Sequence, residues 1–179
     1  MDKNHLCDIV EFYRILAKLK DIKRRGWVLR DIPLGESVSD HTFGVTVLTM
    51  FMAERYSLDV EKAMKTSLIH EVGETEIGDL TPEDDVPPEE KRKKEEAAAE
   101  RILNNVDPSG ELLGLWRDFE YSRTPEGRLV KEIDKFEMGL QAASYGEKHP
   151  EFDKDEFLRS SLAALDHKEL KEIIEKLKG

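Results

Sequence analysis

Apolar residues recur every three or four positions along most of this 179-residue chain, and this spacing constrains the fold more than any other feature. In the first such segment the recurring residues are Leu6, Ile9, Val10, Tyr13, Leu16 and Leu19. They fall on one face of a helix, as expected for an amphipathic helix packed on a core. No segment alternates convincingly with the period of two that marks a half-buried strand. The pattern therefore predicts an all-α protein whose first core helix spans residues 6–19.

Turn-forming residues divide the chain into further helices. The expected ranges are about 39–56, 60–72, 89–106, 110–121, 125–145, 153–165 and 167–178. Ser39 or Asp40 is a suitable N-cap for the second helix. The Gly- and Pro-punctuated stretches 23–35 and 78–88 are expected to be loops, because neither can continue a helix. Without an internal repeat or a low-complexity linker, residues 1–179 are expected to form a single helical domain.

Charge and composition exclude several classes of function. The formal net charge of −11 argues against broad capture of polymeric nucleic acid or anionic membranes, so a small anionic substrate would need a local cationic site. The basic run Lys91–Lys94 is flanked by glutamates and is interpreted as a solvated helix face. Apolar runs are too short to cross a bilayer, and the N-terminus does not resemble a secretory signal. With a single cysteine, Cys7, the chain is expected to be cytoplasmic.

Four ionisable residues stand in otherwise apolar helical stripes: His41, His70, Glu71 and Asp134. Burying such groups without partners is costly, and a shared divalent metal ion would remove that cost. Imidazole and carboxylate ligands suit manganese, cobalt, zinc, iron or nickel, with magnesium a less natural fit for two histidines. The alternative is that His41 caps a helix, that His70 is a hydrogen-bonded core histidine, and that the two carboxylates are solvated.

An ordered series of segments favours the metal site. Glu36–His41, His70–Glu74, Gly78–Pro82 and Leu129–Met138 resemble, in this order, the HD-domain phosphohydrolases, specifically their 5′-deoxynucleotidase branch. The resemblance implies an HD-domain helical bundle with one divalent metal ion per subunit. Its ligands would be His41, His70, residue 71 and Asp134. The superfamily's paired motif is His-Asp, whereas this chain has His70-Glu71, whose carboxylate lies one methylene further from the backbone.

The same resemblance implies roles for residues around the metal. Glu74 and Asp79 match carboxylates that act in proton transfer, and Trp27 matches a tryptophan that helps to exclude ribose. The related enzymes have a substrate-binding arginine immediately before this tryptophan, where this chain has Gly26. Either Arg24 or Arg25 would then hold the phosphate, since guanidinium groups donate paired hydrogen bonds to phosphate oxygens. The alternative is that these basic residues are solvated at a helix end and that Trp27 is a core lid.

The expected activity is hydrolysis of deoxynucleoside 5′-monophosphates by a metal-activated water, with a homodimer as the implied assembly. One alternative is a phosphohydrolase for another small phosphorylated metabolite or a cyclic nucleotide. A second alternative is a metal- or nucleotide-binding sensor without turnover, and a third is a structural helical adaptor. Retention of Glu74 and Asp79 argues against the sensor.

Overall fold

The computed structural model describes residues 3–178, with side chains from residue 9 onward, and confirms the all-α prediction. Within the described residues, β-type pairing is limited to one isolated bridge between Lys23 and Ser37. Residues 1, 2 and 179 of the expected single domain lie outside the described part of the chain. The helices are α1 (Lys3–Ala17), η1 (Lys18–Lys20), α2 (Arg25–Val28), α3 (Val38–Arg55), α4 (Val60–Ile69), α5 (Glu74–Ile77), η2 (Pro82–Asp84), α6 (Pro88–Asn104), α7 (Glu111–Glu120), α8 (Pro125–Lys148), α9 (Lys154–Ala164) and α10 (Lys168–Lys176).

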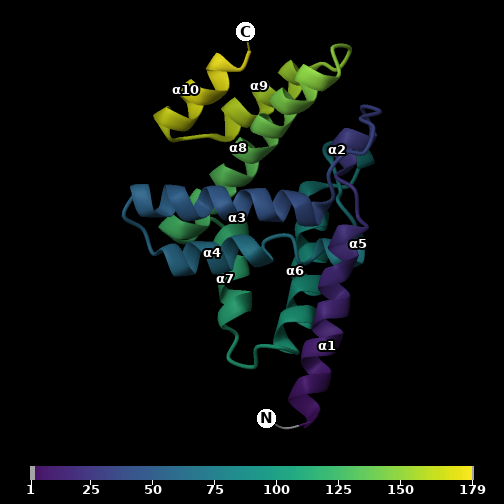
Figure 1. Ribbon diagram of the computed structural model, residues 1–179. Coiled ribbons are helices and arrows are strands. Elements are labelled where there is room, and N and C mark those ends of the chain that lie inside the picture. Colours follow the sequence, from purple (N-terminus) through teal and green to yellow (C-terminus); the bar gives the residue numbers. More distant parts are fainter. Residues whose placement is uncertain (1–2, 179) are drawn as a thin grey trace.

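The long helix α8 is the centre of the bundle and packs against α3, α4, α7, α9 and α10 (Figure 1). Its buried face includes Leu129, Val130, Ile133 and Phe136, which join apolar residues of the surrounding helices in the main core. A second core lies between α4, α6 and α7 and includes Trp116. Since α3, α4 and α8 all contact one another, polar residues on their facing sides are brought together.

Helix α1 corrects the first sequence prediction. Residues 3–17 are helical as expected, but Ile9, Val10 and Tyr13 are about half exposed rather than part of a core. The N-terminal part of α1 extends beyond the bundle (Figure 1), so this face meets no other helix there. Phe12, Ile15 and the predicted Leu16 pack against the second core, and the predicted Leu19 is buried. Leu6 lies outside the residues whose side chains are described.

One prediction of a helix start was also wrong. Helix α3 begins earlier than expected, because its N-cap is Ser37 rather than Ser39 or Asp40. The Ser37 hydroxyl accepts a hydrogen bond from the Asp40 amide, and the Asp40 carboxylate accepts one from the Ser37 amide. This capping box satisfies amides that the first turn leaves unpaired, and it fixes where His41 begins the second turn. The 23–35 and 78–88 stretches are largely irregular but contain the short helices α2 and η2.

None of the helices from residue 3 to residue 178 combines the length and the apolar character needed to cross a bilayer.

Replacing Ser37 with alanine is expected to lower the free energy of unfolding by about 1 kcal/mol, because the α3 cap loses its acceptor. Urea denaturation followed by circular dichroism measures this change. Ser39→Ala, in the first turn of the same helix, is the matched control and is expected to change the stability by less than about 0.5 kcal/mol. Equal losses in the two variants would contradict the assignment of Ser37 as the cap.

Candidate metal centre

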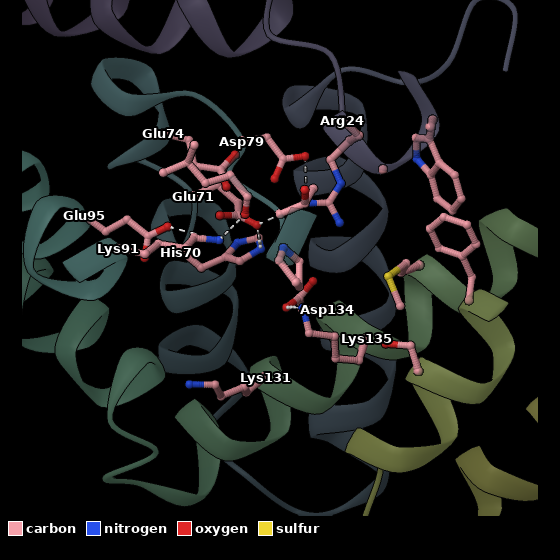
Figure 2. A pocket seen from close by; sticks show the side chains of 18 of the residues that line it. Arg24, His70, Glu71, Glu74, Asp79, Lys91, Glu95, Lys131, Asp134 and Lys135 are labelled. Carbon is pink, nitrogen blue, oxygen red and sulfur yellow. Dashed lines mark hydrogen bonds and ion pairs between the residues drawn. The ribbon is translucent and has the colours of Figure 1, made fainter. Parts of the chain in front are cut away.

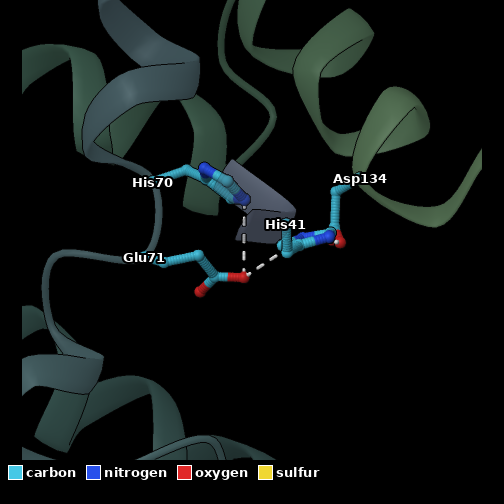
Figure 3. A group of neighbouring side chains, drawn as sticks. All are labelled: His41, His70, Glu71 and Asp134. Atoms are coloured by element: carbon cyan, nitrogen blue, oxygen red, sulfur yellow. Dashed lines mark ion pairs between the residues drawn. The ribbon is translucent and has the colours of Figure 1, made fainter. Parts of the chain in front are cut away.

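The predicted metal-binding residues come together from three helices (Figure 3). His41 lies near the start of α3, His70 is the C-cap of α4 with Glu71 following it, and Asp134 lies in the middle of α8. Each residue offers one ligand atom, and these atoms all lie within 4.8 Å of one another. Helix α4 ends at Ile69, so the backbone turns and lets adjacent His70 and Glu71 face the same point.

Gly73 follows the end of this helix and has a separate role. The helix has already ended before it, and Gly73 has ordinary helical dihedral angles as the N-cap of α5. A Cβ atom at Gly73 would lie 2.9 Å from the backbone oxygen of Glu95 in α6. The glycine therefore permits a close approach between the metal-site turn and α6, rather than a change of chain direction.

Hydrogen bonds aim both imidazoles at the centre of the cluster. His70 Nδ1 donates to the carbonyl oxygen of Ser67 at 2.6 Å, and His41 Nδ1 lies 2.6 Å from Glu137 Oε2. In each ring this leaves Nε2 facing the other candidate ligands, and the Nε2 atoms of His70 and His41 lie 3.4 and 3.8 Å from Glu71 Oε1. Metal-binding histidines in proteins are commonly oriented in this way by a partner on the second nitrogen.

The residues fit a divalent ion, as three buried polar atoms show. His41 Nε2, His70 Nε2 and Asp134 Oδ1 have no hydrogen-bond partner among the described residues. His41 Nε2 and Asp134 Oδ1 are 3.2 Å apart, close enough to attract one another without forming a well-directed hydrogen bond. Unsatisfied buried polar groups cost about 1–3 kcal/mol each. A cation with nitrogen and oxygen ligands would be a common partner for all three.

The surroundings shift the pKa values of the two histidines in opposite directions. Burial lowers the pKa of His70, which keeps its imidazole neutral at pH 7 and able to coordinate a cation. For His41, burial and the charge of Arg24 act to lower the pKa, but Asp134 and Glu137 outweigh them and raise it to about 9. In the metal-free protein at neutral pH, a proton therefore occupies the position that a metal ion would take on His41.

A pocket of about 610 Å³ opens beside these residues, within the size range of small-molecule sites (Figure 2). Its polar wall includes His70, Glu71, Glu74, Asp79 and Asp134. The structure thus brings the two carboxylates predicted to transfer protons to the same pocket as three of the four predicted metal ligands. Burial, together with the charges of Glu71 and Asp79, raises the pKa of Glu74 well above its ordinary value.

The two candidate arginines point in different directions. Arg24 is largely buried in the pocket wall, with Nη1 at 3.7 Å from Glu71 Oε1 and 3.9 Å from Asp79 Oδ2. Arg25 is about half exposed, and its Nε donates to Asp84 Oδ1 at 3.2 Å. The Arg25 backbone amide donates to Asp79 Oδ2 at 2.7 Å, so Arg25 holds the loop while Arg24 faces the site.

Trp27 lines the pocket but is only 1% exposed. Its indole Nε1 donates to Glu36 Oε1 at 2.9 Å, and its ring packs against Phe157 and Tyr145. The Trp27 side chain therefore belongs to a core cluster and also borders the cavity.

Lys91 and Glu95 are pocket residues that the sequence interpretation assigned to a solvated face. Lys91 Nζ donates to the carbonyl oxygen of Leu80 at 2.6 Å and lies 3.6 Å from Glu95 Oε1. The helical spacing could have indicated that these two residues face inward, because residues 91 and 95 continue the face defined by buried Ala98 and Ile102. The solvated-face prediction is correct for Lys93 and Lys94, which are exposed.

Comparisons with known proteins agree with this geometry. The sequence profile of the HD domain matches residues 16–178. The 5′-deoxynucleotidase HDDC2 of Dictyostelium discoideum is 38% identical over 154 residues, covering 81% of this chain and 80% of the relative. The human 5′-deoxynucleotidase HDDC2 is 32% identical over 174 residues, covering 96% of this chain and 85% of the relative. The solved structure of a conserved hypothetical protein from Pyrococcus furiosus matches with a TM-score of 0.74 and 31% identity, covering 94% of this chain and 98% of the other.

Manganese is expected to raise the thermal stability of the metal-stripped protein, by about 2.7 kcal/mol at a concentration of 100 times its Kd. At a fixed manganese concentration, this gain is expected to increase as the pH rises from 6.5 to 9, because the Kd falls. The raised pKa of His41 stabilises the metal-free protein below pH 6.5, and this contribution is lost as the pH rises through 9. Over the same range the competing proton leaves, so metal binding strengthens.

Differential scanning fluorimetry under anaerobic conditions, with and without manganese, measures this effect. His70→Ala is the control and is expected to abolish the manganese-dependent shift. A shift of the same size at both ends of the pH range would contradict proton competition at His41.

Proposed function

This chain belongs to the HD domain family, and from that premise we propose that it is a metal-dependent 5′-deoxynucleotidase. The substrate would be a deoxynucleoside 5′-monophosphate, and the products a deoxynucleoside and phosphate. The observation that carries the proposal is one pocket lined by three of the four clustered candidate metal ligands, together with Arg24, Glu74 and Asp79. The relatives named 5′-deoxynucleotidase support the choice of substrate class.

In this proposal His41, His70, Glu71 and Asp134 hold one divalent ion. When bound, the ion supplies Lewis acidity, which lowers the pKa of water and offsets negative charge on the phosphoryl group. Arg24 binds the phosphate, because its guanidinium is a buried cation that lines the pocket beside the carboxylates of Glu71 and Asp79. Arg25 supports this position by fixing Asp79 through its backbone amide.

The two remaining carboxylates would move protons. The pKa of Glu74 is raised chiefly by burial, and a raised pKa makes its carboxylate a stronger base toward the attacking water. Water forms the new bond to phosphorus as the bond from phosphorus to O5′ breaks. Glu74 accepts a proton from the water, and Asp79 delivers a proton to O5′, so that the leaving group departs as the alcohol. Trp27 borders the cavity where the sugar would lie, and its indole is held in place by Glu36.

We further propose that the enzyme is a cytoplasmic homodimer. Phe43 and Phe51 on α3 and Leu68 on α4 are exposed large apolar side chains, with 71%, 59% and 55% of their surfaces accessible. Such residues are suited to an interface with a second copy of the chain.

Metal-stripped protein is expected to release phosphate from dAMP only after a divalent metal is restored, and to prefer dAMP over AMP. Manganese, cobalt, zinc and magnesium are tested separately, with released phosphate measured by a colorimetric assay. The His70→Ala variant is expected to lose this activity, because one metal ligand is removed. A folded, metal-loaded protein that releases no phosphate from either nucleotide would exclude the deoxynucleotidase assignment.

Arg24→Gln is expected to lower kcat/KM for dAMP by about 10- to 100-fold, the loss expected for a charge-assisted hydrogen bond of about 1.5–3 kcal/mol. The matched variant is Arg25→Gln, whose side chain is paired with Asp84 outside the candidate ligand cluster. It is expected to change kcat/KM much less. Steady-state kinetics at saturating metal distinguishes the two arginines, and a larger loss in Arg25→Gln would reverse their assignment.

A further inference from the structure

Glu137 is a buried carboxylate that the proposed reaction does not use. It lies on α8 with only 7% of its surface exposed, and its Oε2 atom is 2.6 Å from His41 Nδ1. Burying a carboxylate in a helical core is costly unless a polar partner compensates. The partner here is the side chain of a candidate metal ligand, so the cost of burying Glu137 is tied to the metal centre.

Helix α8 supplies a carboxylate to each of the two nitrogen atoms of the His41 ring. Asp134 and Glu137 are three residues apart on α8, which places them on one face of the helix. Asp134 Oδ1 lies 3.2 Å from Nε2, and Glu137 Oε2 lies 2.6 Å from Nδ1. With one nitrogen engaged by Glu137, the ring presents its other nitrogen to Asp134, His70 and Glu71.

A glycine on α3 makes room for this arrangement. Gly44 follows His41 by three residues, so the two lie on the same side of α3. A Cβ atom at Gly44 would lie 2.8 Å from Glu137 Oε1, closer than ordinary van der Waals contact. Any larger residue at position 44 would displace the carboxylate that contacts His41. This packing accounts for a glycine inside a long helix, where glycine costs about 1 kcal/mol relative to alanine.

We propose that Glu137 is a positioning residue for the metal site, and that it fixes the orientation of the His41 ring through Nδ1. Gly44 provides the space in which the Glu137 carboxylate makes this contact. The inference rests on the proposed function, because it assumes that His41 is a metal ligand. It adds an outer carboxylate to the four candidate ligands and predicts that metal affinity depends on two residues that do not touch the ion. Outer partners of this type are commonly worth about 10- to 100-fold in metal affinity.

Manganese affinity is measured by isothermal titration calorimetry of the metal-stripped protein, without nucleotide. Glu137→Gln preserves the size of the side chain but removes its charge, and it is expected to weaken manganese binding by about 10- to 100-fold. Gly44→Ala alters no ligand and no hydrogen-bonding group, and it is expected to weaken binding in the same direction by displacing Glu137. Should Glu137→Gln fail to fold, Gly44→Ala carries the test by itself.

The chain offers matched controls for both substitutions. Glu132 is also buried on α8 and pairs with a histidine, with Oε1 at 2.9 Å from His167 Nδ1. Gly114 lies in α7, and a Cβ atom at this position would meet nothing from neighbouring elements within 4 Å, so alanine fits there. Glu132→Gln is expected to lower the melting temperature and leave manganese affinity unchanged, and Gly114→Ala is expected to leave that affinity unchanged.

The outcomes separate this inference from the proposed function. Wild-type affinity in both Glu137→Gln and Gly44→Ala would overturn the positioning role while leaving the metal site intact. An equal loss of affinity in Glu132→Gln would also overturn it, because general destabilisation would then explain the effect. A wild-type protein that binds no manganese, cobalt or zinc would instead contradict the proposed metal centre itself. All of these outcomes are measured as manganese affinity or thermal stability, without nucleotide hydrolysis.

Discussion

The structure depends on pairing ionisable groups that three helices bury at their meeting point. His41, His70 and Asp134 come from α3, the end of α4 and α8, and all three are almost inaccessible to solvent. Unpaired charges in such a place would oppose folding, whereas paired ones restrict how the helices can cross. Asp134 and Glu137 on α8 contact the two sides of one α3 imidazole, so polar contacts specify the relation of these helices together with the apolar core.

The long helices could be predicted from the sequence because their apolar faces repeat over several turns. The short helices could not, since α2 and α5 have four residues each, too few to establish a period. Periodicity also misidentified part of the face of α1 that packs on the core, because Ile9 and Tyr13 are exposed whereas Leu16 and Leu19 contribute as predicted. An amphipathic pattern describes a face but not its partner, and the N-terminal part of α1 extends beyond the bundle (Figure 1).

The candidate site shows the same division between local pattern and spatial arrangement. An ordered series of motifs pointed to His41, His70, Glu71 and Asp134, although no spacing rule could place residues so distant in sequence within 4.8 Å of one another. The choice between Arg24 and Arg25 was open, because adjacent residues point in different directions and the start of α2 decides which one faces the pocket. Glu137 was missed because a glutamate on a helix is usually solvated.

The end of helix α4 lets Glu71 reach the candidate metal site. His70 is the C-cap of α4, and the turn after it gives Glu71 room that a continuous helix would not provide. Glu71 Oε1 lies 3.4 Å from His70 Nε2 and 3.7 Å from Arg24 Nη1, so the longer side chain still reaches the cluster. One oxygen thus faces both the imidazole of a candidate metal ligand and the guanidinium proposed to bind phosphate. Because the Glu71 carboxylate attracts the Arg24 guanidinium, it holds Arg24 beside the candidate metal centre.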